Sequence, residues 1–426
     1  MNPTIQLLVD RWSTSQQGPR EIRETTCYLS IKISDKIATR IEDRWSKTVD
    51  DRIHISAYPL AIWLAASWWR LRWEPRPRST PGLDWKMSHL MPAAGHGYLW
   101  PVLQIDCDGE EAFITCTSTS QVDHEPIRFL SSFDATAKVR DLEAAIDDFI
   151  EFVTLRLQSI EIHDSELQRL WKEILEERND AEASRYRRLE AQLGFEAGEG
   201  PEDLLDRLLS LRTRAGEEAI GEIALACSGS DPSGALSGIL ERIEAGGVTG
   251  KLRIPSLQKP GAELPPWQRG RQLASTARKS SGISTDRVED TVLEEILGAK
   301  LSSGLLSTKN KVSAGIVVRD PDTGSAKYHF RRHNSSGLRF EAARFMGDAL
   351  IAPAEDRWLM ESDSNSARQK LQRAFAAEFL CPIDRLTEFL GGDFSNEAID
   401  EAGMHFQVSS LAIQSHLANH QVISPF

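Results

Sequence analysis

Two histidine pairs in the C-terminal part of the chain have a spacing seen in metal sites. His416 and His420 lie four residues apart in a stretch predicted to be helical, so both rings would share one face of the helix. A metallopeptidase helix also carries a glutamate between its histidines, which activates the metal-bound water. The residues between this pair are Leu417, Ala418 and Asn419. The pair is therefore a weak metal candidate, and no metal is expected.

The second pair, His329 and His333, lies in a segment whose alternation is typical of a β-strand. Residues four positions apart on a strand face the same way but are about 13 Å apart, so these rings would not share an ion. The five cysteines form no Cys-x-x-Cys pair, so neither a thiolate zinc site nor a disulfide framework is predicted.

Aromatic and basic residues interleave over residues 68–78, which include Trp69, Arg70, Arg72 and Trp73. Such a cluster could stack on bases and hold the phosphates of a nucleic acid. It could equally belong to a protein core, with its arginines lying over rings or pairing with carboxylates. A net charge of −13 disfavours general nucleic-acid binding, which needs a basic surface, so the structural interpretation is preferred.

Three segments in the last third of the chain carry a family resemblance. They are RFEAARFMGD (339–348), AFAAEFLCP (374–382) and FQVSSLA (406–412). In type and order they resemble the signature helices of the ImmA/IrrE zinc metallopeptidases. In that family an Arg-Phe pair leads, after three residues, into His-Glu-x-Gly-His. The resemblance implies a zincin-like, mostly helical domain.

The departure from this family motif lies at the metal ligands. Arg344, Phe345 and Asp348 stand where the family has its first histidine, its glutamate and its second histidine. Residues 369–372, where the family's third ligand is expected, include no carboxylate. A zinc peptidase needs nitrogen, sulfur or carboxylate ligands for its metal and a base that activates the bound water. The resemblance therefore implies a pseudo-active site without zinc or catalytic residues. Glu341 shares the charged face, and Arg344 is expected to pair with Asp348.

Basic residues gather over 327–344, where Arg331, Arg332 and Arg339 are candidate contacts for a phosphate or an acidic ligand. A simpler interpretation is charge balance, because the chain has 50 basic and 63 acidic residues.

The elements that position these residues follow from local patterns. Residues 28–33 alternate like a strand, and two further alternating runs flank Asp108-Gly109, a hairpin signal. Residues 57–73 predict a buried helix or a helix–strand unit. Residues 1–135 are therefore predicted to form a mixed α/β domain rich in tryptophan.

Residues 136–245 are predicted to be helical. Apolar residues recur at helical steps over 142–157, Asp164 is expected to cap the next helix, and a third helix runs from Asp180 to Gly194. A Ser- and Gly-rich stretch, 228–238, predicts a break. Residues 246–269 contain four prolines and four glycines and predict a linker to the last domain, 270–426. The predicted fold class is α+β.

Composition limits the function. The 426 residues are 40% hydrophobic and 27% charged, which is typical of a globular protein. The most apolar stretch, 58–69, is too short to cross a bilayer of ~30 Å, and the cysteine usage favours the cytoplasm.

We therefore expect a catalytically inactive, metallopeptidase-like protein that binds a protein partner as a regulatory subunit and uses no cofactor. The resemblance implies stress response, toxin–antitoxin control or anti-phage defence as its context. One alternative is an active zinc endopeptidase with non-standard ligands. The other is a nucleic-acid-binding protein that uses residues 68–78 and 327–344.

Overall fold

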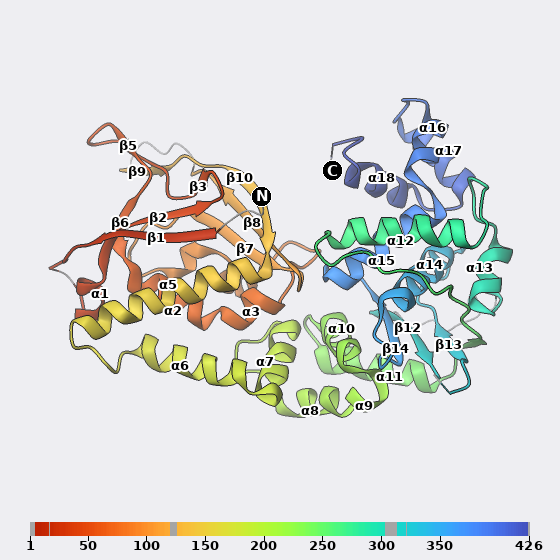
Figure 1. Cartoon of the computed structure of the whole chain (residues 1–426), viewed down its shortest axis with the longest axis horizontal. Helices are drawn as coiled ribbons and strands as arrows, with labels where there is room; N and C mark the ends of the chain where they lie inside the picture. The colour runs from red at the N-terminus through yellow and green to blue at the C-terminus, as the bar shows by residue number, and fades with distance from the viewer. Residues whose placement is uncertain (1–4, 17, 120–125, 303–312, 321, 425–426) are drawn as a thin grey trace. The chain divides into compact units, whose positions relative to one another are not determined.

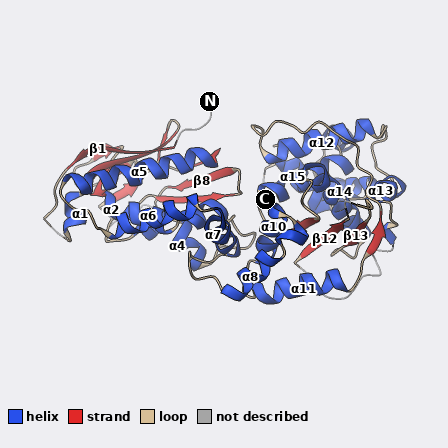
Figure 2. Cartoon of the chain, turned by 60° about the horizontal axis from the view of Figure 1, so that its bottom comes forward, coloured by secondary structure: helices blue, strands red, loops and turns tan. Residues whose placement is uncertain are grey.

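The computed structural model describes residues 5–16, 18–119, 126–302, 313–320 and 322–424. It contains two compact units, Met1–Pro201 and Glu202–Phe426, and each combines helices with strands (Figures 1 and 2). Every paired strand among the described residues is antiparallel, and the sheets are small. The α+β class predicted from the sequence is therefore confirmed.

The strands of the first unit form three small sheets. They are β1 (Ile5–Trp12), β2 (Thr26–Ile33), β3 (Lys36–Ile37), β4 (Ile41–Asp43), β5 (Thr48–Asp50), β6 (Ile53–Ser56), β7 (Val102–Cys107), β8 (Glu111–Thr117), β9 (Ile127–Phe129) and β10 (Phe133–Lys138). β2 pairs with β1, β3 and β6, while β8 lies between β7 and β10, and β4 lies between β5 and β9. The β7–β8 hairpin is the one predicted at Asp108-Gly109.

The helices of the first unit are α1 (Arg20–Glu24), α2 (Ala57–Ala66), α3 (Trp68–Trp73), α4 (Leu83–His89), the 3₁₀ helix η1 (Met91–Ala94), α5 (Val139–Ser159), α6 (Glu166–Asn179) and α7 (Ala181–Leu193). The buried segment 57–73 is thus two consecutive helices. The cap of α6 is Ser165 and not Asp164, because Ser165 and Gln168 form a reciprocal capping box. Asp180 caps α7 and Gly194 ends it, as predicted.

The second unit contains the helices α8 (Glu202–Ser210), α9 (Arg212–Ala215), α10 (Glu217–Cys227), α11 (Pro232–Glu244), α12 (Pro266–Ser280), α13 (Asp290–Leu297), α14 (Ser335–Ile351), α15 (Ala367–Leu380), α16 (Ile383–Leu390), α17 (Asn396–Phe406) and α18 (Ser410–Asn419). Its strands are β11 (Val248–Gly250), β12 (Ala314–Arg319), β13 (Ala326–His329) and β14 (Trp358–Ser362). They form one sheet in the order β11-β13-β12-β14.

Two local predictions in this unit are wrong. The break predicted over 228–238 is shorter, because α11 already begins at Pro232, with Asp231 as its cap. Proline suits the first turn of a helix, where its missing N–H has no partner in any case. The predicted linker 246–269 begins with β11, which pairs with β13, so its first residues belong to the sheet.

The boundary between the compact units lies after Pro201, and the helices of the predicted middle region are divided between the units. The helices α8 to α11 belong to the second unit, where α10 packs against β14. The N–H of Arg357, just before β14, donates to the carbonyl of Ala215 at 2.8 Å. This backbone bond and the packing of α10 explain why residues 202–244 join the C-terminal unit.

The interior of the second unit is built around α14 and α15. The helices α12 and α15 lie side by side (Figures 1 and 2). Their close approach requires glycine at Gly270, where a Cβ would lie 2.4 Å from the carbonyl oxygen of Leu371. Within the described residues, no helix combines the length and apolarity needed to span a membrane.

Candidate functional site: a buried ion-pair network on α14

Helix α14 carries the residues that the sequence resemblance aligns with zinc-ligand positions. Asn334 caps the helix by accepting a hydrogen bond from the N–H of Gly337 at 2.6 Å. Every residue from Arg339 to Asp348 except Phe340 is buried, including the charged ones. Charged side chains are almost never fully buried unless they are paired, so each of them must have a partner inside the unit.

The guanidinium of Arg344 is enclosed by β14 and α15. It donates to the carboxylate of Glu361 and to the side-chain oxygen of Gln369. A third bond, of 2.8 Å, goes to the carbonyl oxygen of Ser362. Burial lowers the pKa of Arg344, although the charge of Glu361 opposes this effect. The guanidinium is therefore held by oxygen atoms from two neighbouring elements.

Asp348 pairs with a different arginine, so the predicted Arg344–Asp348 pair is wrong. Arg368 of α15 donates to the two carboxylate oxygens of Asp348 at 2.6 and 3.1 Å. The same guanidinium donates to Asp356 at 2.7 Å. Spacing along α14 places Arg344 and Asp348 on one face, but the neighbouring elements supply better-placed partners for each of them.

Glu222 of α10 extends this network from the other side of α15. Its carboxylate accepts hydrogen bonds from Gln369 Nε2 at 2.7 Å and from Ser366 Oγ at 2.8 Å. Ser366 also caps α15 by accepting from the N–H of Gln369. Burial raises the pKa of Glu222, although the charge of Arg368 works against this. Four elements of the second unit therefore meet in one polar cluster.

Glu341, also on α14, is enclosed by different neighbours from those of Arg344 and Asp348. Its carboxylate accepts hydrogen bonds from the backbone N–H groups of Arg331 at 2.9 Å and Arg332 at 3.0 Å. The backbone of β12 approaches it so closely that a Cβ at Gly315 would lie 2.0 Å from Oε1 of Glu341. Burial and the negative charge of Glu361 raise the pKa of Glu341 to about 8, despite these hydrogen bonds.

This raised pKa predicts a pH-dependent stability. An unfolded glutamate has a pKa of about 4.3, so between about pH 5 and pH 8 the folded protein holds a proton that the unfolded chain has released. The free energy of unfolding should therefore fall as the pH rises, by up to ~1.4 kcal/mol per pH unit from this group. Urea denaturation at several pH values should show this slope in the wild type and a clearly smaller one in Glu341→Gln. Equal slopes in both proteins would contradict the prediction.

Phe345, which the sequence resemblance aligns with a catalytic glutamate, belongs to the apolar core. Its ring lies 5.8 Å from the ring of Phe330 and 6.4 Å from that of Tyr328, measured between centroids. Its side chain offers no proton acceptor, so this position cannot activate a water molecule.

The basic residues near α14 are occupied by partners. The side chain of Arg331 is 8% exposed and forms paired hydrogen bonds to Glu361 and Asp363. Arg339 is 1% exposed, pairs with Asp290 and donates to the carbonyl oxygen of Val288. Arg332 is largely exposed and lies 3.5 Å from Asp363. Of these three candidate ligand contacts, Arg332 is the one that the structure leaves accessible.

The arginines and tryptophans of the Trp/Arg cluster, residues 68–78 of the first unit, bind partners within that unit. Arg70 is 1% exposed, and it donates to Glu74 and Glu196 at 2.7 Å and to Asp84 at 2.8 Å. Trp69 is also buried, and its Nε1 donates to Glu177 at 3.0 Å.

The other half of the cluster is engaged in the same way. Arg72 donates to Glu143 and to the carbonyl of Gly109, and its guanidinium lies 3.8 Å from the ring centre of Trp73. Contact with a nucleic acid would require these side chains to leave their present partners.

Several residues of the α14 network were missed by sequence reasoning. Glu361, Arg368 and Glu222 lie in three different elements, and nothing in their local sequence marks them. Gln369 and Gln372 are the exception, because their spacing could have indicated a buried polar pair. Two amides three residues apart share one face of a helix, and this helix continues into an apolar run. Both are fully buried and donate to the carbonyl oxygen of Met360 at 2.9 Å.

Comparison of this chain with protein-family models, with curated proteins and with solved structures finds no match.

Proposed function

We propose that the second unit is a metallopeptidase-like domain of the ImmA/IrrE type that works without zinc at α14, as a binding or regulatory subunit for a protein partner. The proposal rests on the resemblance of its three helical segments and on the chemistry of the α14 network. The context implied by the resemblance is stress response, toxin–antitoxin control or defence against phages.

The observation that carries the proposal is the enclosure of the Arg344 guanidinium. It stands at a zinc-ligand position and brings a positive charge of its own to Glu361 and Gln369. A zinc ion at this place would be repelled by the guanidinium and would have no imidazole ligand there. The remaining ligand position is Asp348, whose oxygens are occupied by Arg368. The residues at the implied ligand positions are thus held in an ion-pair network that offers no ligand set for zinc.

A binding role needs an accessible surface, and the helices α16 and α17 offer one. Three side chains on them or on their connection are exposed to a considerable degree: Phe389, Phe394 and Met404, at 43%, 37% and 72%. Phe389 stacks on His405, with ring centroids 4.7 Å apart. Exposed aromatic and methionine side chains are enriched at protein interfaces. We therefore place the partner's contact on this α16–α17 surface.

The test is affinity purification from the native host with mass spectrometry of the captured proteins. A specific protein should copurify with the wild type and be lost, or strongly reduced, with Met404→Glu or Phe394→Glu. Leu83→Glu is the matched control, since Leu83 is 76% exposed and lies in the first unit. A partner retained by the Met404 and Phe394 variants would contradict the assigned surface.

The alternative of an active zinc endopeptidase is tested with the same protein preparations. We expect no zinc-stimulated cleavage of unstructured protein substrates by the wild type. The double variant Arg344→His with Asp348→His should also be inactive, because Phe345 still provides no base. Zinc-stimulated cleavage by the wild type that disappears in Asp348→Asn would overturn the proposed function.

A further inference from the structure

The helical histidine pair near the C-terminus acquires a third neighbour in the folded chain. His416 lies on α18 and His420 follows its last residue, while Glu378 comes from α15. One ligand atom from each of these three residues lies within 4.8 Å of the other two. Nε2 of His416 is 3.5 Å from Oε2 of Glu378, and the two imidazole rings are nearly perpendicular, with centroids 4.8 Å apart.

One of the two buried groups lacks a hydrogen-bond partner. His416 is 5% exposed, and its Nε2 has no hydrogen bond to any described residue, although Glu378 is near. A buried polar atom left in this state destabilises the folded protein. Glu378 is held in place, since its carboxylate accepts a hydrogen bond from the N–H of Ile383 at 3.3 Å. A metal ion between Glu378 and His416 would accept the lone pair of His416 Nε2 and so give this nitrogen a partner.

We propose that Glu378, His416 and His420 form a binding site for a divalent transition-metal ion of the Zn²⁺ class. Two imidazoles and one carboxylate are a ligand set that zinc uses in proteins, and they leave a fourth position open for water. Ligands of a tetrahedral zinc lie roughly 3.4 Å apart, which the His416–Glu378 distance already matches. His420 completes the set by a movement of its ring at the end of α18, where the side chain is partly exposed.

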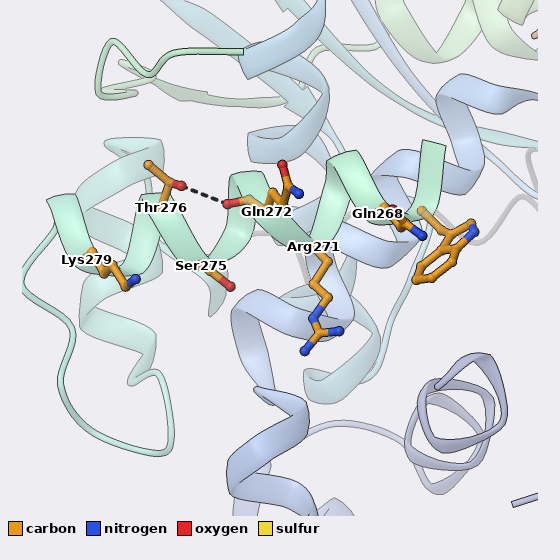
Figure 3. A pocket seen from close by; sticks show the side chains of 7 residues that line it. Gln268, Arg271, Gln272, Ser275, Thr276 and Lys279 are labelled. Carbon is orange, nitrogen blue, oxygen red and sulfur yellow. Dashed lines mark hydrogen bonds between the residues drawn. The ribbon is translucent and has the colours of Figure 1, made fainter. Parts of the chain in front are cut away.

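Arg271 is the group that opposes a cation here. Its Nη1 lies 3.4 Å from Nδ1 of His420, and its Nε lies 3.9 Å from Oε2 of Glu378. The side chain is 39% exposed and lines an open groove of about 530 Å³ along α12. Figure 3 shows Arg271 projecting from α12 among the other residues that line this groove. Because it borders this open space, Arg271 has room to turn away from the two ligands when the ion binds.

This site is independent of α14 and of the proposed function. It revises the sequence expectation that the chain binds no metal, because that expectation considered the histidine pair without Glu378. Variants on α14 distinguish a metal bound at this site from one bound at α14, because a metal held at Glu378, His416 and His420 is retained when Asp348 is changed.

The experiment is calorimetric titration of chelator-treated full-length protein with ZnCl₂, with the visible spectrum of the Co²⁺ form as a second readout. We expect one ion per chain and the absorption bands of a tetrahedral Co²⁺ site. His416→Gln and His420→Gln should each weaken binding at least about tenfold. His420 is partly exposed, so its variant should fold even if the one at His416 does not.

Three further variants sharpen the test. His333→Gln removes an exposed histidine of the same unit and should leave the affinity unchanged, and so should Asp348→Asn. Arg271→Gln should tighten binding, because it removes the opposing charge. Absence of stoichiometric binding, or equal affinity in wild type and His420→Gln, would overturn the site. A loss in Asp348→Asn with none in His420→Gln would move the metal to α14 and refute both proposals.

Discussion

Replacement of Arg368 with methionine is expected to lower the free energy of unfolding of the second unit by about 3–5 kcal/mol. Arg368 bridges two carboxylates, Asp348 and Asp356, whose side chains are 0% and 1% exposed. Burial alone would lower the pKa of Arg368, but these carboxylates and Glu222 raise it above its ordinary value. Without the guanidinium, these two buried carboxylates would lose the charge and the hydrogen bonds that Arg368 supplies.

Urea denaturation followed by circular dichroism measures this effect, and Arg385→Met is the matched control. Arg385 is 51% exposed and pairs with Asp286 and Glu388, which are 51% and 71% exposed. Exposed pairs of this kind contribute about 0–1 kcal/mol. Adding Asp348→Asn to Arg368→Met should recover part of the loss, because it removes one unpaired charge. If Arg368→Met unfolded at the same urea concentration as Arg385→Met, the network would not stabilise the unit.

Arg344→Met is expected to cost about 3 kcal/mol, at the lower end of the range for a broken buried ion pair. The cost has two sources, because Glu361 loses one cation and the side-chain oxygen of Gln369 loses a donor. It is limited because Glu361 keeps its two hydrogen bonds from Arg331, at 2.6 and 2.7 Å. The same denaturation experiment measures it.

A second substitution tests whether charge is the cause. Glu361→Gln combined with Arg344→Met removes the carboxylate left without its cation, so part of the lost stability should return. If the single and double variants were equally unstable, packing and not charge would explain the loss. The comparison also bears on the proposed function, because the proposal assigns Arg344 a structural role in the ion-pair network and no role in metal binding.

Arg344 and Arg368 show why the charged residues of α14 cannot be interpreted from the spacing along that helix alone. Glu341, Arg344 and Asp348 do share the buried part of the helix, as their spacing predicted. The spacing also suggested that they bind one another, because residues four positions apart on a helix are neighbours. An i,i+4 pair gains a few tenths of a kcal/mol, whereas a buried charge needs much more compensation, so partners from other elements prevail.

Local patterns in the sequence were sufficient for features that depend on a few adjacent residues. The β7–β8 hairpin follows from Asp108-Gly109, and the ends of α7 follow from Asp180 and Gly194, because turns and caps are short-range interactions. The identities of Arg344, Phe345 and Asp348, which the resemblance aligns with metal-binding and catalytic positions, can also be read from the sequence. The capping residue of α6 was misplaced by one position, since Asp164 and Ser165 are both good caps.

The tertiary structure decided which distant residues meet. Helices α8 to α11 join the second unit because α10 packs on β14, and this brings Glu222 to Gln369, 147 positions later in the chain. In the same way, α18 is placed on α15, and Glu378 becomes the neighbour of His416 and His420. Helical periodicity predicts which residues share a face. It carries no information about which residues of other elements pack against that face. The ion-pair partners of α14 and the Glu378 carboxylate beside the histidine pair both come from such elements.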